Sequence, residues 1–331
     1  MTVKMAIPNK GRLNERSIEL ITKAGINLGD DWGRKLNIKV PDLDLEVFFV
    51  RAQDIPIFID SGAVDFGITG QDVTAEAGKE LKNVLNLRFG QCRLSIAAPE
   101  ESAIARTGKM EDGIRVATSF PYLTRKYFED RGISAEIVFV QGAAEIMPQL
   151  GVSDAISDLV ATGSTLRMNR LKEIDTVIES EASVFTTQKV LDDPDKKDRI
   201  GEIVDAIRSV LDADGRKYVM ADVQKSRLKD VERIIPGIGG PTVVNIAGND
   251  DWVAVQAVIS GDWNTFADGA SVRPGARGPP VRNILRILGR PIEGAERYPP
   301  RSNAALAGCF AMTPSAYNDT PVRSSERTSE G

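Results

Sequence analysis

Short apolar runs alternate with amphipathic segments along most of the first two hundred residues. Apolar runs bounded by Gly, Pro, Asn or Asp are typical of buried strands, and apolar residues spaced three and four apart are typical of helices that pack against a sheet. The predicted strands are residues 3–7, 45–50, 64–69, 93–98, 115–118, 137–140 and 155–160. The predicted helices are residues 13–24, 54–60, 124–130 and 143–150. Strands and helices that alternate with short loops predict an α/β protein with a mostly parallel sheet.

A different order of elements follows a predicted helix at residues 199–210. One strand at residues 216–223 precedes a helix at 226–234, and two further strands follow at 242–246 and 252–258. This order predicts a small α+β regulatory or docking module, which is ferredoxin-like if one more helix and one more strand complete it.

The pattern breaks near Ser260. Eight of the 17 prolines lie after residue 270, and residues 271–280 (SVRPGARGPP) favour neither a helix nor a strand. The apolar spacing of residues 281–288 is helical rather than alternating. We therefore expect a module at 214–290 that is atypical or incomplete after about residue 260, and a disordered tail at 291–331.

Composition narrows the possible chemistry. The chain of 331 residues is long enough for two or three domains, and its formal net charge of −5 does not suggest a nucleic-acid partner. There is no histidine, so Ser-His-Asp and Cys-His nucleophiles are excluded, and the two cysteines do not form a zinc motif. The sequence shows neither a signal peptide nor an apolar run long enough to span a membrane, which predicts a cytoplasmic protein without a membrane partner.

The strongest candidate site lies at residues 154–166 (DAISDLVATGSTL). An apolar strand carries Asp158 to its carboxyl end, and a short loop with a glycine and three hydroxyls then begins the next helix. The loop residues are Thr162, Gly163, Ser164 and Thr165. Backbone amides and hydroxyls in such a loop favour a phosphate, and the carboxylate before it can accept hydrogen bonds from ribose hydroxyls. The alternative is a Ser/Thr-capped helix after a strand.

Further polar residues follow other predicted strands. They are Lys10, Gly11 and Arg12 after the first strand, Arg51 after the second, and Gly70 and Asp72 after the third. Open α/β sheets bind ligands at this edge, although a single Lys-Gly-Arg turn is more often a solvated loop. Glu145 and Asp72 are candidates to face a metal or act as a base, and either could instead balance a helix dipole.

Several stretches resemble those of the ATP phosphoribosyltransferase family, in the same order and at the same spacing, over about residues 1–258. They are MAIPNKGRL, VRAQDIPIFIDSGAVDFGITGQD, RFGQCRLSIAAP, RVATSFPYLTRKYF and AEIMPQLGVSDAISDLVATGSTL. Two later stretches, IIPGIGGPTVVNI and WVAVQAVI, are similar to the histidine-binding regulatory domain of the long form.

The resemblance implies a bilobal catalytic core like that of type II periplasmic binding proteins, followed by a ferredoxin-like regulatory domain. Lobe I would comprise residues 1–90 with about 184–210, and lobe II residues 91–183. Within this core, Asp154, Asp158 and the 162–165 loop match the motif for 5-phosphoribosyl 1-pyrophosphate (PRPP), and both aspartates would orient the ribose. The loop at residues 10–12, together with Arg51, Gly70, Asp72 and Glu145, would meet ATP or its phosphates.

The implied reaction joins N1 of the adenine of ATP to C1 of PRPP, with Mg²⁺ as cofactor, and releases N1-(5-phosphoribosyl)-ATP and pyrophosphate at the start of histidine synthesis. The resemblance also implies a homo-oligomer, a dimer or a hexamer, and L-histidine as an inhibitor. Two alternatives stay open from the residues alone. One is a non-catalytic bilobal protein that binds a small molecule, and the other is an inactive regulatory paralogue.

Overall fold

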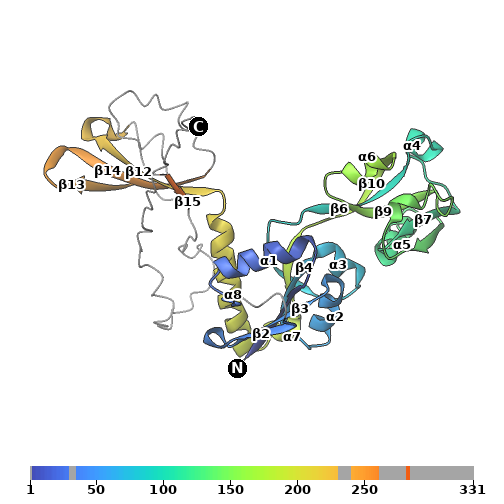
Figure 1. The fold of residues 1–331 in the computed structure, drawn as a ribbon, viewed down its shortest axis with the longest axis horizontal. Coiled ribbons are helices and arrows are strands. Elements are labelled where there is room, and N and C mark those ends of the chain that lie inside the picture. Colours follow the sequence, from blue (N-terminus) through green and yellow to red (C-terminus); the bar gives the residue numbers. More distant parts are fainter. Residues whose placement is uncertain (1, 30–34, 230–239, 261–280, 284–331) are drawn as a thin grey trace, which may run out of the picture. The chain divides into compact units, whose positions relative to one another are not determined.

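The chain forms three β-sheets, and helices pack against the first two of them (Figure 1). The computed structural model describes residues 2–29, 35–229, 240–260 and 281–283. The chain divides into two units, residues 1–288 and 289–331, and every described residue belongs to the first. No helix among these residues is long and apolar enough to cross a membrane.

The first sheet has six strands in the order β2-β3-β1-β4-β11-β5. These are β2 (Asn37–Val40), β3 (Leu45–Val50), β1 (Val3–Pro8), β4 (Phe66–Gly70), β11 (Ala182–Thr186) and β5 (Lys82–Asn86). β3, β1 and β4 run parallel, so their carboxyl ends share one edge, whereas β11 lies antiparallel between β4 and β5.

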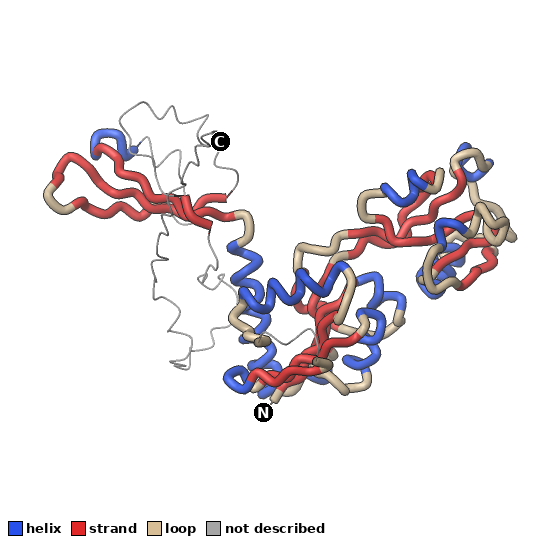
Figure 2. The backbone as a smooth tube through the Cα atoms, viewed as in Figure 1, coloured by secondary structure: helices blue, strands red, loops and turns tan. Residues whose placement is uncertain are grey.

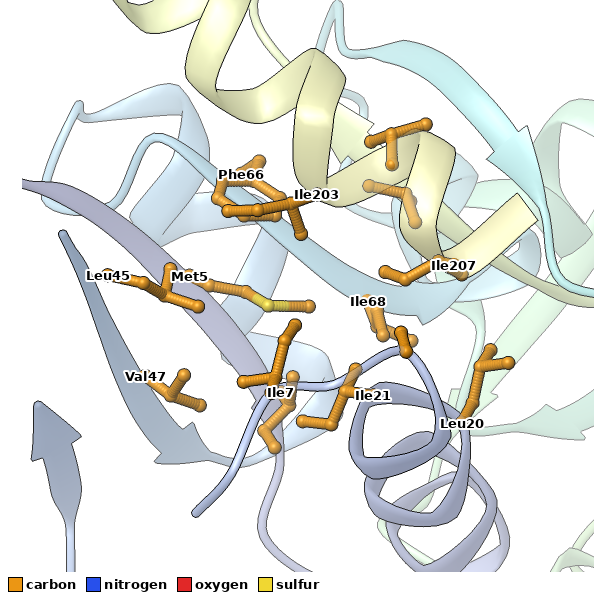
Figure 3. Close-up of a cluster of buried hydrophobic side chains, with 14 of the residues drawn as sticks. Met5, Ile7, Leu20, Ile21, Leu45, Val47, Phe66, Ile68, Ile203 and Ile207 are labelled. Carbon is orange, nitrogen blue, oxygen red and sulfur yellow. The ribbon is translucent and has the colours of Figure 1, made fainter. Parts of the chain in front are cut away.

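Helices cover both faces of this sheet. α1 (Arg12–Lys23) and the long α8 (Pro194–Ala213) pack on one face, and α2 (Ile55–Asp60) packs on the other. Figure 3 shows the larger core, in which β-strand side chains meet both covering helices: Met5, Ile7, Leu45, Val47, Phe66, Ile68, Leu20, Ile21, Ile203 and Ile207. Each fully buried side chain of this size contributes about 1.5–3 kcal/mol. This core packs around strands β1, β3 and β4, and the candidate residues of the first sheet follow the carboxyl ends of these strands.

The second sheet has five strands in the order β10-β6-β9-β7-β8. These are β10 (Leu171–Ser180), β6 (Cys92–Pro99), β9 (Ala155–Val160), β7 (Ile114–Thr118) and β8 (Ala135–Phe139). β8, β7 and β9 are parallel, and β6 lies antiparallel beside β9. α5 (Pro121–Glu129) packs on one face, and η4 (Ala144–Ile146) and α6 (Ser164–Met168) pack on the other.

Both sheets repeat one topology. In each, three parallel strands are followed by an antiparallel strand that enters directly after the chain has left the other sheet: β6 follows β5, and β11 follows β10. This is the bilobal arrangement of type II periplasmic binding proteins, so the predicted fold class is confirmed. The exact lobe boundaries remain a prediction.

Two local expectations were wrong. The sheets are mixed rather than mostly parallel, because strands β2, β6, β10 and β11 pair antiparallel with their neighbours. The predicted helix at residues 143–150 is only the 3₁₀ turn η4 followed by further turns. Ala143 adopts a left-handed conformation with φ of 53°, and Pro148 lacks an amide donor, so a regular helix does not propagate there.

The third sheet has the order β13-β14-β12-β15, all antiparallel (Figure 2). Its strands are β12 (Arg216–Gln224), β13 (Thr242–Ile246), β14 (Asn249–Ser260) and β15 (Val281–Asn283). With β12 as the first strand this is the ferredoxin-like order, as predicted. Val281–Asn283 pairs with β12 as a strand, and the apolar residues that gave residues 281–288 a helical spacing lie after Asn283, outside the described residues.

Several predicted segments lie outside the described residues. They are the later part of the helix at 226–234, residues 261–280, residues 284–290 and the tail at 291–331.

Candidate active site

The loop between β9 and α6 presents amides and hydroxyls at an exposed sheet edge. Gly163 has φ of 72°, a left-handed conformation that glycine adopts without strain, and it turns the chain into the helix. Oγ1 of Thr162 lies 3.0 Å from Oγ of Ser164. Thr165 is exposed beside them. Because α6 has only five residues, the loop's own donors matter more here than a helix dipole.

Asp158 is half-buried at the carboxyl end of β9, just before this loop. Burial raises the pKa of its carboxyl, the negative charge of Glu145 raises that pKa further, and a hydrogen bond from the Leu159 amide (2.8 Å) opposes both. Glu145 lies in η4, which follows the left-handed Ala143. Two carboxylates from different elements therefore interact at the edge that carries the loop.

Asp154 lies at the opposite end of β9. It precedes Asp158 by four residues, which is about 13 Å along a strand. Its carboxylate accepts hydrogen bonds from the Arg115 guanidinium (2.8 and 3.2 Å) and from the Arg115 backbone amide (3.0 Å), and this pairing holds the pKa of Asp154 below its usual range. The expected contact between Asp154 and the ribose is not supported by this geometry. Asp154 instead joins β7 to the start of β9.

Three cationic side chains gather at the carboxyl edge of the first sheet. Lys10 and Arg12 follow β1, and Arg51 follows the neighbouring parallel strand β3. All three are exposed, and none has an ion-pair partner among the residues that the structure describes. Gly11 begins α1 with φ of 82°, and Nδ2 of the buried Asn14 donates to the carbonyl of Pro8 (2.6 Å), which anchors the loop.

Asp72 is buried at the start of α3 (Gln71–Glu76) and does not face solvent. Its carboxylate accepts a hydrogen bond from Oγ of Ser180 (2.7 Å), and its amide donates to the same oxygen (3.0 Å). A Cβ at Gly70 would lie 2.1 Å from Oδ1 of Asp72, so only glycine leaves room for this carboxylate. In this structure Gly70 and Asp72 secure the segment that leads from β10 into β11.

A pocket of about 430 Å³ lies beside that crossing segment. Its lining residues come from the start of α3, from the chain entering β6, from the end of β9 and from the β10–β11 connection: Gln71, Gln91, Cys92, Arg93, Ala161, Glu179, Ser180 and Glu181. Ala161 directly precedes Thr162, so the pocket adjoins the loop after β9.

Two residues beside these groups had no role in the sequence prediction. The guanidinium of Arg167 donates to the carbonyl of Thr162 (3.3 Å) and places a cation next to the loop. Arg167 lies three residues after Ser164, a spacing that places both side chains on one face of a helix. The sequence alone could therefore have indicated a cation next to the loop. Ser180 had no local signal, because its partner Asp72 is 108 residues away.

The chain is similar to known proteins over most of its length. A family model described as ATP phosphoribosyltransferase matches residues 51–209, and the model of the family's C-terminal domain matches residues 213–264. An ATP phosphoribosyltransferase of Methanopyrus kandleri is 44% identical over 262 residues, covering 78% of this chain and 89% of the relative. One from Natronomonas pharaonis is 44% identical over 257 residues, with the same coverage.

A solved structure agrees with these matches. A chain of the ATP phosphoribosyl transferase (HisG:HisZ) complex from Thermotoga maritima superimposes with a TM-score of 0.57 at 28% identity, and the match covers 64% of this chain and 99% of that one. The sequence matches, the repeated bilobal topology and the loop after β9 lead to one conclusion: the chain belongs to the ATP phosphoribosyltransferase family.

Proposed function

We propose that the edge of the second sheet binds PRPP and that the edge of the first sheet meets the phosphates of ATP or PRPP. Membership of the family makes the chain a transferase, an ATP phosphoribosyltransferase of the first step of histidine biosynthesis. The observation that carries the site assignment is the exposed loop at Thr162–Thr165 directly after Asp158, on a strand whose end also meets Glu145.

The reaction forms one bond and breaks one. The lone pair of adenine N1 forms a bond to C1 of the ribose, and the electron pair of the bond from C1 to the pyrophosphate oxygen leaves with pyrophosphate, with inversion at C1. Adenine N1 is unprotonated at neutral pH, so no strong base is required, which suits a chain without histidine. The main catalytic demand is to orient the two substrates and to stabilise the charge that grows on the leaving pyrophosphate.

The residues divide this work. Thr162, Gly163, Ser164 and Thr165 supply donors for the 5′-phosphate, and Asp158 accepts hydrogen bonds from the ribose hydroxyls. Lys10, Arg12 and Arg51 supply positive charge for polyphosphate in a protein whose net charge is −5. Arg167, held against the loop, adds a further cation.

The donor set also fits Mg²⁺. The described residues include no cluster of three or more metal-ligating side chains, but Mg²⁺ in phosphate-transfer sites is commonly held by one or two carboxylates together with substrate phosphates. Asp158 and Glu145 would be the protein ligands, because the negative charge of Glu145 contributes to the raised pKa of Asp158. When bound, the ion would neutralise charge on the pyrophosphate.

We also propose that the chain forms homo-oligomers, as the resemblance implies, and that it acts in the cytoplasm. A non-catalytic binding protein or an inactive paralogue would share the fold but would not consume ATP. Incubation with ATP, PRPP and Mg²⁺ separates these cases, because only the enzyme produces the absorbance of an N1-substituted adenine.

The phosphate loop is tested by Thr165→Ala. Loss of one donor to a charged phosphate should raise the KM for PRPP by about tenfold, with a much smaller change in the KM for ATP. Steady-state kinetics with each substrate varied in turn would measure both constants. Equal effects on the two substrates, or no effect, would contradict the loop assignment.

A further inference from the structure

Three hydroxyl side chains are completely buried together in the second sheet. Thr118 ends β7, Ser157 lies directly opposite it in β9, and Thr124 lies in the overlying helix α5, each with 0% exposure. Oγ1 of Thr124 is 2.8 Å from Oγ of Ser157 and 3.3 Å from Oγ1 of Thr118. Oγ1 of Thr118 also accepts the amide of Phe120 (2.9 Å).

These contacts form a chain of hydrogen bonds. The Phe120 amide donates to Oγ1 of Thr118, and Oγ1 of Thr124 lies within hydrogen-bond distance of both Thr118 and Ser157. Because a hydroxyl has one proton, Thr124 donates to one of these two neighbours and accepts from the other. The chain joins the loop after β7, the helix α5 and the strand β9. Valine has the shape of threonine and would fill the same space without burying a hydroxyl, so stability alone does not require this network.

The network ends one residue before Asp158. Successive side chains of a strand point to opposite faces, so Ser157 faces α5 while Asp158 faces the side of η4 and α6. Hydrogen bonds to Ser157 on one face of β9 therefore restrict the translation and rotation of the strand next to Asp158, whose side chain projects from the other face. Apolar contacts would not do this as well, because they lack the direction of a hydrogen bond.

We infer that the Thr118–Thr124–Ser157 network is a positioning device that orients Asp158 and the following loop for PRPP. This inference rests on the proposed PRPP site. The three residues do not touch substrate. They act through β9, so their removal should change the binding of PRPP more than that of ATP.

The test uses Thr124→Val, which removes the hydroxyl with little change of shape, and Thr124→Ser, which keeps it. Thr124→Val should raise the KM for PRPP by about five- to tenfold with little change in kcat or in the KM for ATP. Thr124→Ser should restore the KM for PRPP to near the wild-type value. Thermal unfolding is recorded for every variant.

The matched control is Thr186→Val. Thr186 is also fully buried, and its hydroxyl donates to the carbonyl of Asp65 (2.7 Å) in the first sheet. Its loss should lower the melting temperature but leave the KM for PRPP unchanged. A purely structural role for Thr124 would give the same result as this control.

A folded Thr124→Val variant with a wild-type KM for PRPP would overturn the inference, as would equal impairment of Thr124→Val and Thr124→Ser. If Thr124→Val does not fold, Ser157→Ala is judged by the same criteria. The variant Asp158→Asn distinguishes failure of the positioning network from failure of the proposed PRPP site. If it weakens PRPP binding while Thr124→Val does not, only the network fails, and if it has no effect, the site assignment itself fails.

Discussion

Asp158 and Asp154 occupy one strand but have opposite electrostatic surroundings. Burial and the charge of Glu145 raise the pKa of Asp158, so its ionised form is disfavoured in the folded protein. The Arg115 guanidinium lowers the pKa of Asp154, so its ionised form is favoured. A carboxylate kept in a place that disfavours its charge is typical of a functional residue, whereas a paired carboxylate at a strand end is typical of a structural one.

Asp158→Asn should therefore weaken PRPP binding while leaving the fold intact. Loss of the charged acceptor should cost about ten- to a hundredfold in affinity. Because the folded-state pKa is raised, removing the charge should leave the melting temperature at pH 7 unchanged or higher. Wild-type affinity should fall as the pH drops toward this raised pKa, and the variant should lack that dependence. Calorimetric titration over a pH series measures both effects.

Asp154→Asn is the matched control. A lowered pKa means that the pair stabilises the folded state above the unfolded-state pKa near 3.8, and that this stability is lost as the pH falls through the folded-state value. Because both side chains are partly exposed, the variant should be only slightly less stable than the wild type at pH 7. Its PRPP affinity should match the wild type. If both variants weakened PRPP binding equally, the distinction between the two aspartates would be wrong.

At the scale of elements, parallel strands explain how residues distant in sequence meet. β1 and β3 run side by side in register from Val3 opposite Leu45 to Pro8 opposite Val50, and the Asn9 amide donates to the carbonyl of Val50 (2.8 Å). The loops after them must therefore leave the sheet at one edge. This places the cations of both loops together, although about forty residues separate them.

The double variant Lys10→Gln with Arg12→Gln should weaken polyphosphate binding by at least about tenfold at low ionic strength. It should also flatten the salt dependence, because exposed charges are screened as ionic strength rises. The control is Arg16→Gln with Lys23→Gln, which removes the same amount of charge from α1, where both side chains pair with Glu19. Kinetics at low and high salt compare them. Equal behaviour of the two double variants would argue for a general effect of net charge.

At the scale of the whole molecule, the described part of the strand that closes the ferredoxin-like sheet is Val281–Asn283. β12 has nine residues, and the described part of β15 pairs with Lys217, Tyr218 and Val219. Among the described residues, the outer edge of β12 from Met220 to Gln224 has no strand beside it. The three prolines of the preceding stretch SVRPGARGPP cannot donate ladder hydrogen bonds, so we expect this module to be less stable than the first two sheets.

We therefore expect L-histidine to inhibit the enzyme weakly or not at all. A regulatory ligand needs a well-defined binding site, and its binding must shift a conformational equilibrium of the protein. A module of low stability offers a less defined site and transmits such a shift less well. Initial rates with and without millimolar L-histidine measure the effect, and calorimetry measures binding independently. Strong inhibition together with tight binding would show that the module is functionally complete.

Local patterns in the chain were sufficient for the alternation of strands and helices and for the loop at Thr162–Thr165, and the break near Ser260 stays a prediction. These features depend on residues close in sequence: apolar runs, glycines that permit left-handed turns, and prolines that remove donors. The family motifs extended the prediction to the bilobal fold, which the sheet order confirmed.

Pairing between distant segments decided the rest. The antiparallel strands β6 and β11 depend on neighbours from another part of the chain, and no local period encodes a partner. Asp72 and Ser180, separated by 108 residues, and Thr124 and Ser157, separated by 33, acquire their contacts only in the folded chain. Asp154 and Asp158 look equivalent in sequence. They differ in the folded protein because they lie at opposite ends of β9, and only its carboxyl end leads into the loop.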